Sequence, residues 1–373
     1  MTLLIVVNED RFFLSHRKEI AMAARKQGWD VTIVCKNTGQ RQEVEALGMR
    51  MVELPINPTG MKLRQELRTL VFLYRLYRKE CPDVVHHVGL KTMLWGGLAA
   101  RLTGVRGVVN AVSGLGVMFS GENASLTARG VLALLRYACH RKGVRIIFQN
   151  HEDKGLFLQH RVITEGQSVY VKGSGVDLNV FSYTPQTDGK VVRILFMARM
   201  VREKGVAILV EAAERLRSDF EGKAEFWLCG RLASNADALT KADMDAMCDG
   251  SYIRWLGHRD DMAELLKASH IVAFPSYYRE GVPKSLIEAC ATGRPIVTTD
   301  NIGCRDVVEN GVNGFLVPVR NSAALADRLR VLIEDRALRE EMGRNGRRKA
   351  EREFSLKDVV ERHLQLYHQL VQN

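Results

Sequence analysis

Short apolar runs alternate with longer amphipathic stretches along the first half of the chain. Strands are predicted at residues 3–7, 31–35, 51–54, 84–87, 107–112, 144–149 and 169–172, and helices at 15–27, 62–80, 92–102 and 126–140. Apolar strands that alternate with helices indicate a parallel sheet covered on both faces.

A polar stretch rich in turn-forming residues, 183–189, predicts a linker, and the same alternation restarts after it. The second set of strands is predicted at 192–197, 224–229, 253–255, 271–274, 295–299 and 314–317, and the helices at 205–216, 262–268, 283–292, 322–335, 336–352 and 356–370. We therefore expect an α/β fold in which two doubly wound Rossmann-like domains, 1–184 and 185–355, face each other across a cleft. Helix 356–373 is expected to join the first domain. Ligands of such sheets bind at the carboxyl ends of the strands.

Composition supports this picture and adds one asymmetry. The 373 residues are too many for one core, and seven scattered cysteines without metal-ligand spacing favour a reducing compartment. No signal segment or long uncharged apolar run is apparent, so we expect a cytoplasmic protein. The net charge is +11, of which +10 falls in residues 1–184 and +1 in the remainder. This imbalance suggests a polyanionic partner, although it could also serve solubility alone.

The predicted helix 62–80 has the pattern of a basic amphipathic helix. Leu63, Leu67, Leu70, Val71, Tyr74 and Tyr77 are expected on one side, and Lys62, Arg64, Arg68, Arg75, Arg78 and Lys79 on the remainder. Such a helix can lie on an anionic lipid surface, but it can equally pack on the sheet with its charges in water. The charge asymmetry favours peripheral contact with the inner face of the cytoplasmic membrane.

The segment from Glu280 to Glu288 is the most informative in the chain. Pro283 can occupy the first helical position, where its missing N–H costs nothing, and the N–H groups after it form an anion site. Gly281 allows the backbone to approach a phosphate closely. Two glutamates at this spacing are also common on an ordinary helix, so the segment alone decides little.

A second segment supports the same chemistry. The strand predicted at 192–197 is followed by Arg199 and Lys204, and then by a helix. A guanidinium and an ammonium group together can neutralise a diphosphate and stabilise it as a leaving group. By itself, this segment could also be a solvated basic loop.

Together these segments resemble the family-4 retaining glycosyltransferases of the GT-B fold. The resemblance covers nearly the whole chain and includes Asp300-Asn-Ile-Gly-Cys-Arg-Asp306 and Asn310-Gly-Val-Asn-Gly-Phe-Leu-Val-Pro318. It implies that Arg199 and Lys204 bind the donor diphosphate, that Glu288 holds the ribose hydroxyls and that Glu280 contacts the donor sugar. The donor loop is then formed by Gly281, Val282, Pro283, Lys284 and Ser285. The resemblance implies neither a metal nor a cofactor, and Asp260-Asp261 is interpreted as a helix N-cap.

The first half resembles enzymes that extend oligosaccharides linked to undecaprenyl diphosphate, as in capsule, lipopolysaccharide or glycoprotein glycan synthesis. The motifs are Phe12-Phe-Leu-Ser-His-Arg17, Ser113-Gly-Leu-Gly116 with Phe119, Phe148-Gln-Asn150 and Gly173-Ser-Gly-Val-Asp177. Candidate acceptor residues are His16, Ser113, Gly114 and Asn150, with His86 and His87 as further candidates for lining the cleft. The loop Asn8-Glu-Asp-Arg11 departs from the glycine-rich loop of many relatives, and Ser113 lies near a position where many carry histidine.

The expected reaction moves a hexose or N-acetylhexosamine from a nucleotide diphosphate sugar, UDP rather than GDP by analogy, to a lipid-linked saccharide. Retention is expected through front-face attack; the rival route, a protein nucleophile, would use Glu9, Asp10 or Glu122. A soluble small-molecule acceptor is the alternative. A phosphorylase or epimerase would share the fold, but no pyridoxal lysine or added phosphate site is apparent. A nucleic-acid-binding protein is disfavoured because no aromatic and basic interleaving is seen on the strands.

Overall fold

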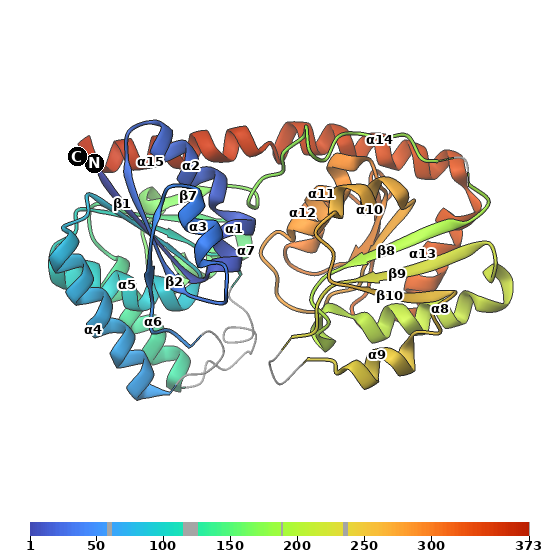
Figure 1. The fold of residues 1–373 in the computed structure, drawn as a ribbon, viewed down its shortest axis with the longest axis horizontal. Coiled ribbons are helices and arrows are strands. Elements are labelled where there is room, and N and C mark those ends of the chain that lie inside the picture. The colour runs from blue at the N-terminus through green and yellow to red at the C-terminus, as the bar shows by residue number, and fades with distance from the viewer. Residues whose placement is uncertain (58–61, 115–125, 188, 234–237, 373) are drawn as a thin grey trace. The chain divides into compact units, whose positions relative to one another are not determined.

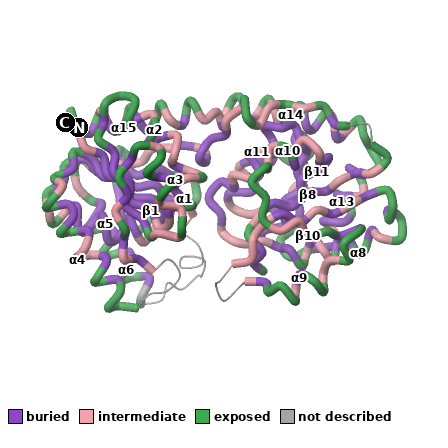
Figure 2. The backbone as a smooth tube through the Cα atoms, viewed as in Figure 1, coloured by how far each residue is buried: buried purple, intermediate pink, exposed green. Residues whose placement is uncertain are grey.

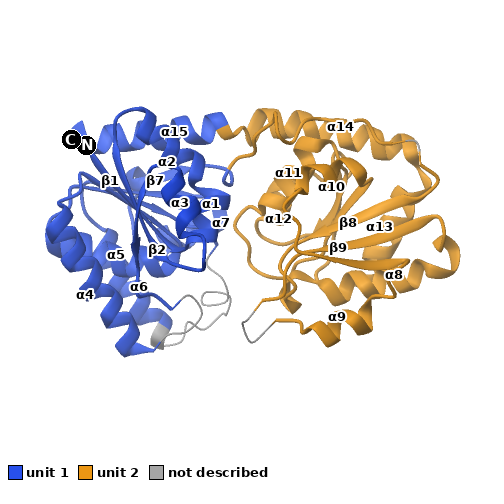
Figure 3. Ribbon diagram, viewed as in Figure 1, with its two compact units in different colours: residues 1–174, 357–373 blue, residues 175–356 orange. Residues whose placement is uncertain are grey.

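The computed structural model describes residues 1–57, 62–114, 126–187, 189–233 and 238–372. The chain folds as two compact units, Met1–Ser174 with Lys357–Asn373, and Gly175–Leu356 (Figure 3). Each unit is a parallel sheet with helices on both faces (Figure 1), which confirms the expected pair of doubly wound Rossmann-like folds.

The first unit contains a seven-stranded sheet in the order β3-β2-β1-β4-β5-β6-β7. Its strands are β1 (Thr2–Glu9), β2 (Asp30–Lys36), β3 (Arg50–Glu53), β4 (Val84–Val88), β5 (Gly107–Ala111), β6 (Val144–Phe148) and β7 (Ser168–Tyr170). Its helices are α1 (Asp10–His16), α2 (Lys18–Lys26), α3 (Arg41–Ala46), α4 (Leu63–Glu80), α5 (Leu90–Thr103), α6 (Leu126–Cys139), α7 (His151–Gln159), the 3-10 turn η2 (Glu165–Gln167) and α15 (Leu356–Gln372).

Two cores sandwich this sheet, because successive residues of each strand face opposite sides. On one side, Leu4 and Val6 of β1 pack with α4, α5, α6 and α7. On the other, Leu3 and Ile5 pack with α1, α2 and α15. The C-terminal helix α15 therefore belongs to the first unit through its apolar side chains, including Tyr367.

The second unit contains a six-stranded sheet in the order β10-β9-β8-β11-β12-β13. Its strands are β8 (Val192–Met197), β9 (Ala224–Cys229), β10 (Ile253–Gly257), β11 (Ile271–Phe274), β12 (Ile296–Thr299) and β13 (Gly314–Val317). Its helices are the 3-10 turn η3 (Arg202–Lys204), α8 (Val206–Phe220), α9 (Lys241–Met247), α10 (Met262–Ala268), α11 (Lys284–Thr292), α12 (Cys304–Val307), α13 (Ser322–Glu334) and α14 (Arg336–Glu353).

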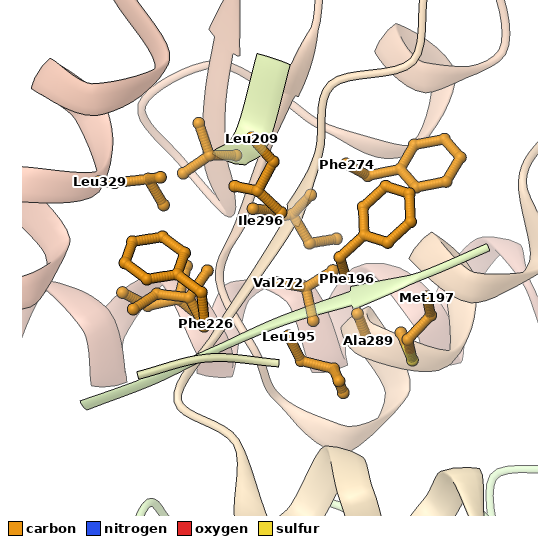
Figure 4. Close-up of a cluster of buried hydrophobic side chains, with 14 of the residues drawn as sticks. Leu195, Phe196, Met197, Leu209, Phe226, Val272, Phe274, Ala289, Ile296 and Leu329 are labelled. Carbon is orange, nitrogen blue, oxygen red and sulfur yellow. The ribbon is translucent and has the colours of Figure 1, made fainter. Parts of the chain in front are cut away.

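A single continuous core holds the second unit together. Phe196 and Phe274 stack from adjacent strands, with ring centroids 6.0 Å apart, and Leu209 and Leu329 pack from the helices (Figure 4). Core side chains pack on both faces of this sheet and hold its strands in place. The loops at the carboxyl ends of β8, β11 and β12 therefore start from fixed positions.

The structure refines several expected elements. The helix expected at 15–27 is two helices, which break at Arg17, whose ψ of −7° and φ of −130° are not helical. The short helices α3, α7, α9 and α12 were not expected from the sequence, because segments this short show little apolar periodicity. The other predicted strands and helices are confirmed within a few residues at their ends.

Candidate active site

Lys204 is placed by a tight turn after β8. It ends the 3-10 turn η3, and Gly205 follows with a φ of +83°. A Cβ at Gly205 would lie 2.1 Å from the carbonyl oxygen of Pro275, so only glycine allows this turn to approach the end of β11. The Glu203 carbonyl oxygen accepts a hydrogen bond from the Tyr277 N–H at 3.0 Å, which ties the two loops together.

Lys204 and Glu280 form a half-buried ion pair between these loops. Ser276, which is fully buried, donates from Oγ to Glu280 Oε1 at 2.9 Å. The carbonyl oxygen of Ser276 in turn accepts a hydrogen bond from the Thr299 hydroxyl at the end of β12. Three adjacent strands therefore fix one carboxylate and one ammonium group at the carboxyl edge of the sheet.

Tyr278 and Arg199 lie at the same site. Burial raises the pKa of the Tyr278 hydroxyl, the charges of Glu280 and Glu203 add to the shift, and Arg199 opposes it. The Lys204 ammonium lies 5.7 Å from the centroid of the Tyr278 ring. Arg199 itself is exposed, one residue beyond Ala198 at the end of β8. Its guanidinium is therefore accessible to an anion.

The helix α11 begins one residue later than expected. Pro283 is its N-cap rather than its first helical residue, with a ψ of 122°, and its carbonyl oxygen accepts from the Leu286 and Ile287 N–H groups. Gly281 and Val282 are buried, whereas Lys284 and Ser285 are partly exposed. The N-terminus of α11 is thus directed at the loop that carries Glu280, as an anion site requires.

Glu288 lies one turn further along α11. Burial raises the pKa of Glu288 to about 7, although the Lys284 ammonium, 3.7 Å from its carboxylate, opposes the shift. The side chain is 13% exposed and also accepts a hydrogen bond from Lys284, so its oxygens are near the surface and a ligand hydroxyl could donate to them. A perturbed pKa in such a position is typical of a functional residue.

The loop after β12 contacts the segment that carries Tyr278 and Gly281. A Cβ at Gly303, where φ is +82°, would lie 1.6 Å from the Gly281 carbonyl oxygen. Asn301 Nδ2 donates to the Tyr278 carbonyl oxygen at 2.7 Å. The motif from Asp300 to Asp306 therefore shapes the site, whereas Asn313 of the next motif is buried and closes the turn before β13 by donating to the Val307 carbonyl oxygen.

Sequence reasoning did not identify Ser276 and Tyr278 as members of this site. Both follow directly on the buried strand β11, and polar residues at the carboxyl end of a parallel strand are the signal that could have indicated them. Asn301 lies in the motif from Asp300 to Asp306, but the sequence alone predicted no role for its side chain.

The proposed acceptor residues of the first unit have different surroundings from one another. His16 ends α1, its ring stacks on Phe12 with centroids 4.3 Å apart, and its Nδ1 lies 2.6 Å from Ser15 Oγ. Asn150 is the N-cap of α7, is fully buried and accepts from the Asp153 N–H at 2.7 Å. Asn150 is therefore occupied in capping a helix.

Ser113 and Gly114 follow β5 at the carboxyl edge of the sheet and are partly exposed, as an acceptor site would require. The remainder of that motif, Gly116 and Phe119, lies outside the described residues, as does Glu122.

His86 and His87 do not line a cleft, which corrects the expectation from the sequence. Both are fully buried in β4. His87 Nδ1 donates to Asn110 Oδ1 at 2.8 Å, and its Nε2 accepts from the Tyr77 hydroxyl at 2.9 Å. His86 Nδ1 lies 2.7 Å from the Tyr367 hydroxyl. They are structural residues, because β4 is covered by helices on both faces.

Asp10 also has a structural role. Its buried carboxylate accepts hydrogen bonds from the Thr38 N–H at 2.7 Å and the Gln40 N–H at 3.0 Å. Burial by itself would raise the pKa of Asp10, but these hydrogen bonds hold it below its usual value. A carboxylate that ties the loops after β1 and β2 together is a poor candidate for a nucleophile.

Helix α4 is amphipathic in a different sense from the one expected. Leu73, Leu76 and Tyr77 form its buried face, whereas an additional apolar stripe is exposed: Leu63 (69%), Leu67 (47%), Val71 (46%) and Tyr74 (36%). Lys62 is the N-cap, and all six expected basic residues are exposed: Lys62, Arg64, Arg68, Arg75, Arg78 and Lys79. The expected single apolar side is therefore divided, because Leu70 and Tyr77 pack against the core and the other four residues are exposed.

Two features concern metals and membranes. Over the described ranges, no cluster of three or more His, Cys, Asp or Glu side chains is placed to hold a metal ion. Asp261 is the N-cap of α10, and its carboxylate pairs with Arg259. In the same ranges, every helix is too short or too polar to span a bilayer.

Two doubly wound units, each built on a parallel sheet, are the architecture of the GT-B class, which includes many glycosyltransferases. Residues 184–349 match the family model for glycosyl transferases group 1, and residues 2–150 match the glycosyl transferase 4-like model. The two matches fall one in each unit, and the chain is therefore a glycosyltransferase, as the resemblance had indicated.

Curated relatives cover nearly the whole chain. One is the N,N'-diacetylbacillosaminyl-diphospho-undecaprenol alpha-1,3-N-acetylgalactosaminyltransferase of Campylobacter jejuni, 26% identical over 97% of this chain and 99% of that protein. Another is the UDP-Gal:alpha-D-GlcNAc-diphosphoundecaprenol alpha-1,3-galactosyltransferase of Escherichia coli, 25% identical over 92% of this chain and 90% of that protein.

Solved structures establish the fold. A glycosyltransferase from Rickettsia africae superposes with a TM-score of 0.79 at 18% identity, covering 100% of this chain and 99% of that one. HepE from Anabaena, in complex with UDP, superposes with a TM-score of 0.78 at 18% identity, covering 99% and 100%. The expected GT-B architecture is thereby confirmed.

Proposed function

We propose that this glycosyltransferase moves a hexose or N-acetylhexosamine from a UDP-sugar to a saccharide carried on a lipid diphosphate, in the synthesis of a cell-surface polysaccharide or glycan. The observation that carries this proposal is the activity for which the two relatives above are named, since both act on saccharides linked to undecaprenyl diphosphate. Their alignment over at least nine-tenths of this chain includes both units.

The donor site is assigned to the second unit. Arg199 and Lys204 neutralise the diphosphate, Glu288 accepts hydrogen bonds from the ribose hydroxyls, and Glu280 contacts the donor sugar. The backbone N–H groups of residues 281–285 complete the site. The ion pair between Lys204 and Glu280 supports this assignment, because a charged pair at the carboxyl edge of β8 and β11 is placed where ligands bind open α/β sheets.

The reaction retains the anomeric configuration through attack on the face from which the diphosphate departs. The bond from the anomeric carbon to the β-phosphate oxygen breaks, and the bond to the acceptor oxygen forms on the same face. The acceptor hydroxyl proton moves to a β-phosphate oxygen. Arg199, Lys204 and the N-terminus of α11 stabilise the negative charge that develops on the departing diphosphate.

The donor assignment is tested by thermal shift with UDP, GDP, ADP and TDP on the native enzyme, Glu288→Ala and the control Glu341→Ala. Glu341 is an exposed carboxylate of the same unit, on α14. Ligand at about 100 times its Kd adds about 2.7 kcal/mol of stability. We expect stabilisation by UDP that is lost only in Glu288→Ala. Stabilisation that survives in Glu288→Ala would remove Glu288 from the donor site.

The acceptor assignment is tested by product analysis. Native enzyme is given the same N-acetylhexosamine either free or linked to undecaprenyl diphosphate, and the anomeric configuration of the product is read by NMR. Transfer to the lipid-linked form with retention is expected. Equal transfer to the free sugar would favour the soluble-acceptor alternative, and a trapped glycosyl–protein adduct would overturn the front-face route.

We also propose that α4 holds the enzyme at an anionic membrane surface. Its exposed apolar stripe and basic residues support this, since the two α4 carboxylates are engaged elsewhere: Glu66 is buried against Trp95 and Lys91, and Glu80 pairs with Arg50 at 2.6 Å. Each basic residue near such a surface contributes about 1 kcal/mol. Arg68→Ala/Arg75→Ala should weaken sedimentation with phosphatidylglycerol vesicles. Binding that is equal on neutral phosphatidylcholine would refute this proposal.

A further inference from the structure

A basic groove of about 540 Å³ lies along helix α6 in the first unit. Its lining consists of three arginines, two histidines, one tyrosine and two apolar residues: Arg101, Arg129, Arg136, His140, His160, Tyr137, Leu132 and Ala133. The lining contains no carboxylate, so its charged side chains are all cations that attract an anion.

Two of these cations, Arg129 and Arg136, are exposed on the surface of α6. Leu135, Ala138 and Cys139 form the buried face of α6, whereas Arg129 and Arg136 are exposed beside that face. Within the described part of the chain, neither of these two arginines forms an ion pair. Arginines left unpaired on one helix face, two turns apart, are available to an external ligand.

Arg101 and Tyr137 give the groove a fixed wall. Arg101 Nη1 donates to the Tyr137 carbonyl oxygen at 2.6 Å, and its guanidinium lies 4.2 Å from the centroid of the Tyr137 ring. Because this contact joins the end of α5 to α6, one cation and one aromatic ring are held in place before any ligand binds. A preorganised site loses less conformational entropy on binding.

The position of the groove separates it from the catalytic edge. The last turn of α6 leads directly into β6, so Arg136 and His140 lie near the edge where the strands begin. Donor and acceptor chemistry belongs to the opposite, carboxyl edge. The end of the groove at Arg136 and His140 is therefore away from the site that would hold the reacting hydroxyl, whereas Arg129 is in the first turn of α6.

The surroundings of the groove are apolar and continue the layer that contains α4. Leu102, Leu134 and Tyr137 are exposed by 56%, 41% and 52%. Helix α5 packs between α4 and α6, so the outer sides of α4 and α6 form one helical layer on the same face of the sheet (Figure 2). Arginines beside exposed leucine and tyrosine side chains suit the boundary between lipid headgroups and acyl chains.

We propose that this groove binds the phosphate of an anionic phospholipid headgroup, with Arg129 and Arg136 as its ligands and Leu134 and Tyr137 at the acyl boundary. One guanidinium group can donate two parallel hydrogen bonds to two phosphate oxygens, which makes arginine better suited than lysine to this role. The inference rests on the proposed membrane contact of α4 and extends it, since α4 supplies a charged face and the α6 groove supplies a specific headgroup site.

The test uses Arg129→Ala/Arg136→Ala in the full-length enzyme and a charge-matched control, Lys26→Ala/Lys357→Ala. The control residues are exposed on α2 and α15, which cover the other face of the sheet. Vesicles of phosphatidylcholine with and without phosphatidylglycerol are sedimented with each protein, alongside the α4 variant Arg68→Ala/Arg75→Ala. Each groove arginine should contribute about fivefold, so the double variant should bind the anionic vesicles about 25-fold more weakly, with the control unchanged.

The outcomes separate the two proposals. If native enzyme does not bind the anionic vesicles, both the membrane contact and the groove site are wrong. If the α4 variant is weakened and the groove variant binds like the control, only the groove site is wrong. A third arm titrates native enzyme with inorganic phosphate and glycerol 3-phosphate, and binding of either that is as tight as binding to vesicles would overturn the lipid as the source of the phosphate.

Discussion

Replacing Glu288 with glutamine should weaken donor binding and, at the same time, stabilise the unliganded enzyme. The structure gives the reason for both effects. Burial raises the pKa of Glu288 to about 7, so near neutral pH the folded enzyme maintains a buried carboxylate at a cost in stability. Glutamine has nearly the same shape without the charge, but it presents one acceptor oxygen to the ribose instead of two.

The stability effect has a definite sign and pH window. Because the folded-state pKa lies above the unfolded value of 4.5, the folded protein holds the proton more tightly. Stability from this group is therefore full below pH 4.5 and is lost as the pH rises through about 7. At 1.36 kcal/mol for each pKa unit, the loss approaches about 3 kcal/mol at pH 8. The free energy of unfolding of Glu288→Gln, relative to native enzyme, should rise by this amount between about pH 4.5 and pH 8.

The same substitution should weaken the binding of UDP, although it stabilises the unliganded enzyme. If only the carboxylate accepts both ribose hydroxyls, the Kd for UDP should be about tenfold higher at pH 6 than at pH 8, since a group with a pKa near 7 is then mostly protonated. Isothermal titration calorimetry on both proteins separates this from the titration of UDP itself, because that titration is common to both. Glu288→Gln should bind UDP more weakly at pH 8 and should lack the additional pH dependence.

Two results would refute this reasoning. A Glu288→Gln variant that is less stable than native enzyme at pH 8 would mean that the carboxylate is satisfied within the protein. A UDP affinity with the same pH profile in both proteins would mean that Glu288 does not contact the nucleotide. The first result would show that Glu288 does not lower the stability of the folded enzyme, as a trade-off between stability and function requires. The second would show that the donor assignment is wrong.

Three further changes should act through the same site or the buried core. Ser276→Ala removes the hydroxyl that holds Glu280, and kcat/KM should fall about tenfold in steady-state transfer assays, the loss of about one hydrogen bond to a charged group. Gly303→Ala forces a Cβ onto the Gly281 carbonyl oxygen, so UDP binding measured by calorimetry should be lost, together with about 1–3 kcal/mol of stability in urea unfolding. Burial holds the pKa of His87 at about 4, so native stability present above pH 6.5 should fall by about 2 kcal/mol at pH 5 in urea unfolding, and His87→Gln should reduce this slope.

The second unit could be predicted from the sequence because its site is mostly local. Glu280, Gly281, Pro283 and Glu288 lie in one segment that connects a strand to a helix, so their proximity requires no knowledge of the sheet order. The pair between Lys204 and Glu280 could not be predicted in the same way. Residues 204 and 280 meet because β8 and β11 are neighbours in the sheet, and that pairing is a property of the topology.

The first unit was harder to interpret because its polar residues are largely buried for structural reasons. His86 and His87 sit in a strand that is covered on both faces, and consecutive residues of that strand reach opposite cores. Asn150 follows a strand, as an active-site residue would, but it caps α7 instead. Single-residue signals at strand ends therefore do not distinguish a ligand contact from a cap.

The uneven charge of the chain is easier to understand once the helical layer of the first unit is considered. A donor diphosphate requires only a few fixed cations, and in the proposed donor site Arg199, Lys204 and a helix N-terminus would supply them in a second half whose net charge is +1. The excess of +10 in the first half is larger than the few cations that the diphosphate of a lipid-linked acceptor would need. On α4 and along the α6 groove, this excess lies beside exposed apolar side chains rather than opposite carboxylates. Repulsion among these like charges lowers the stability of the isolated fold, and contact with a negatively charged surface, as proposed for α4 and the α6 groove, would offset that cost.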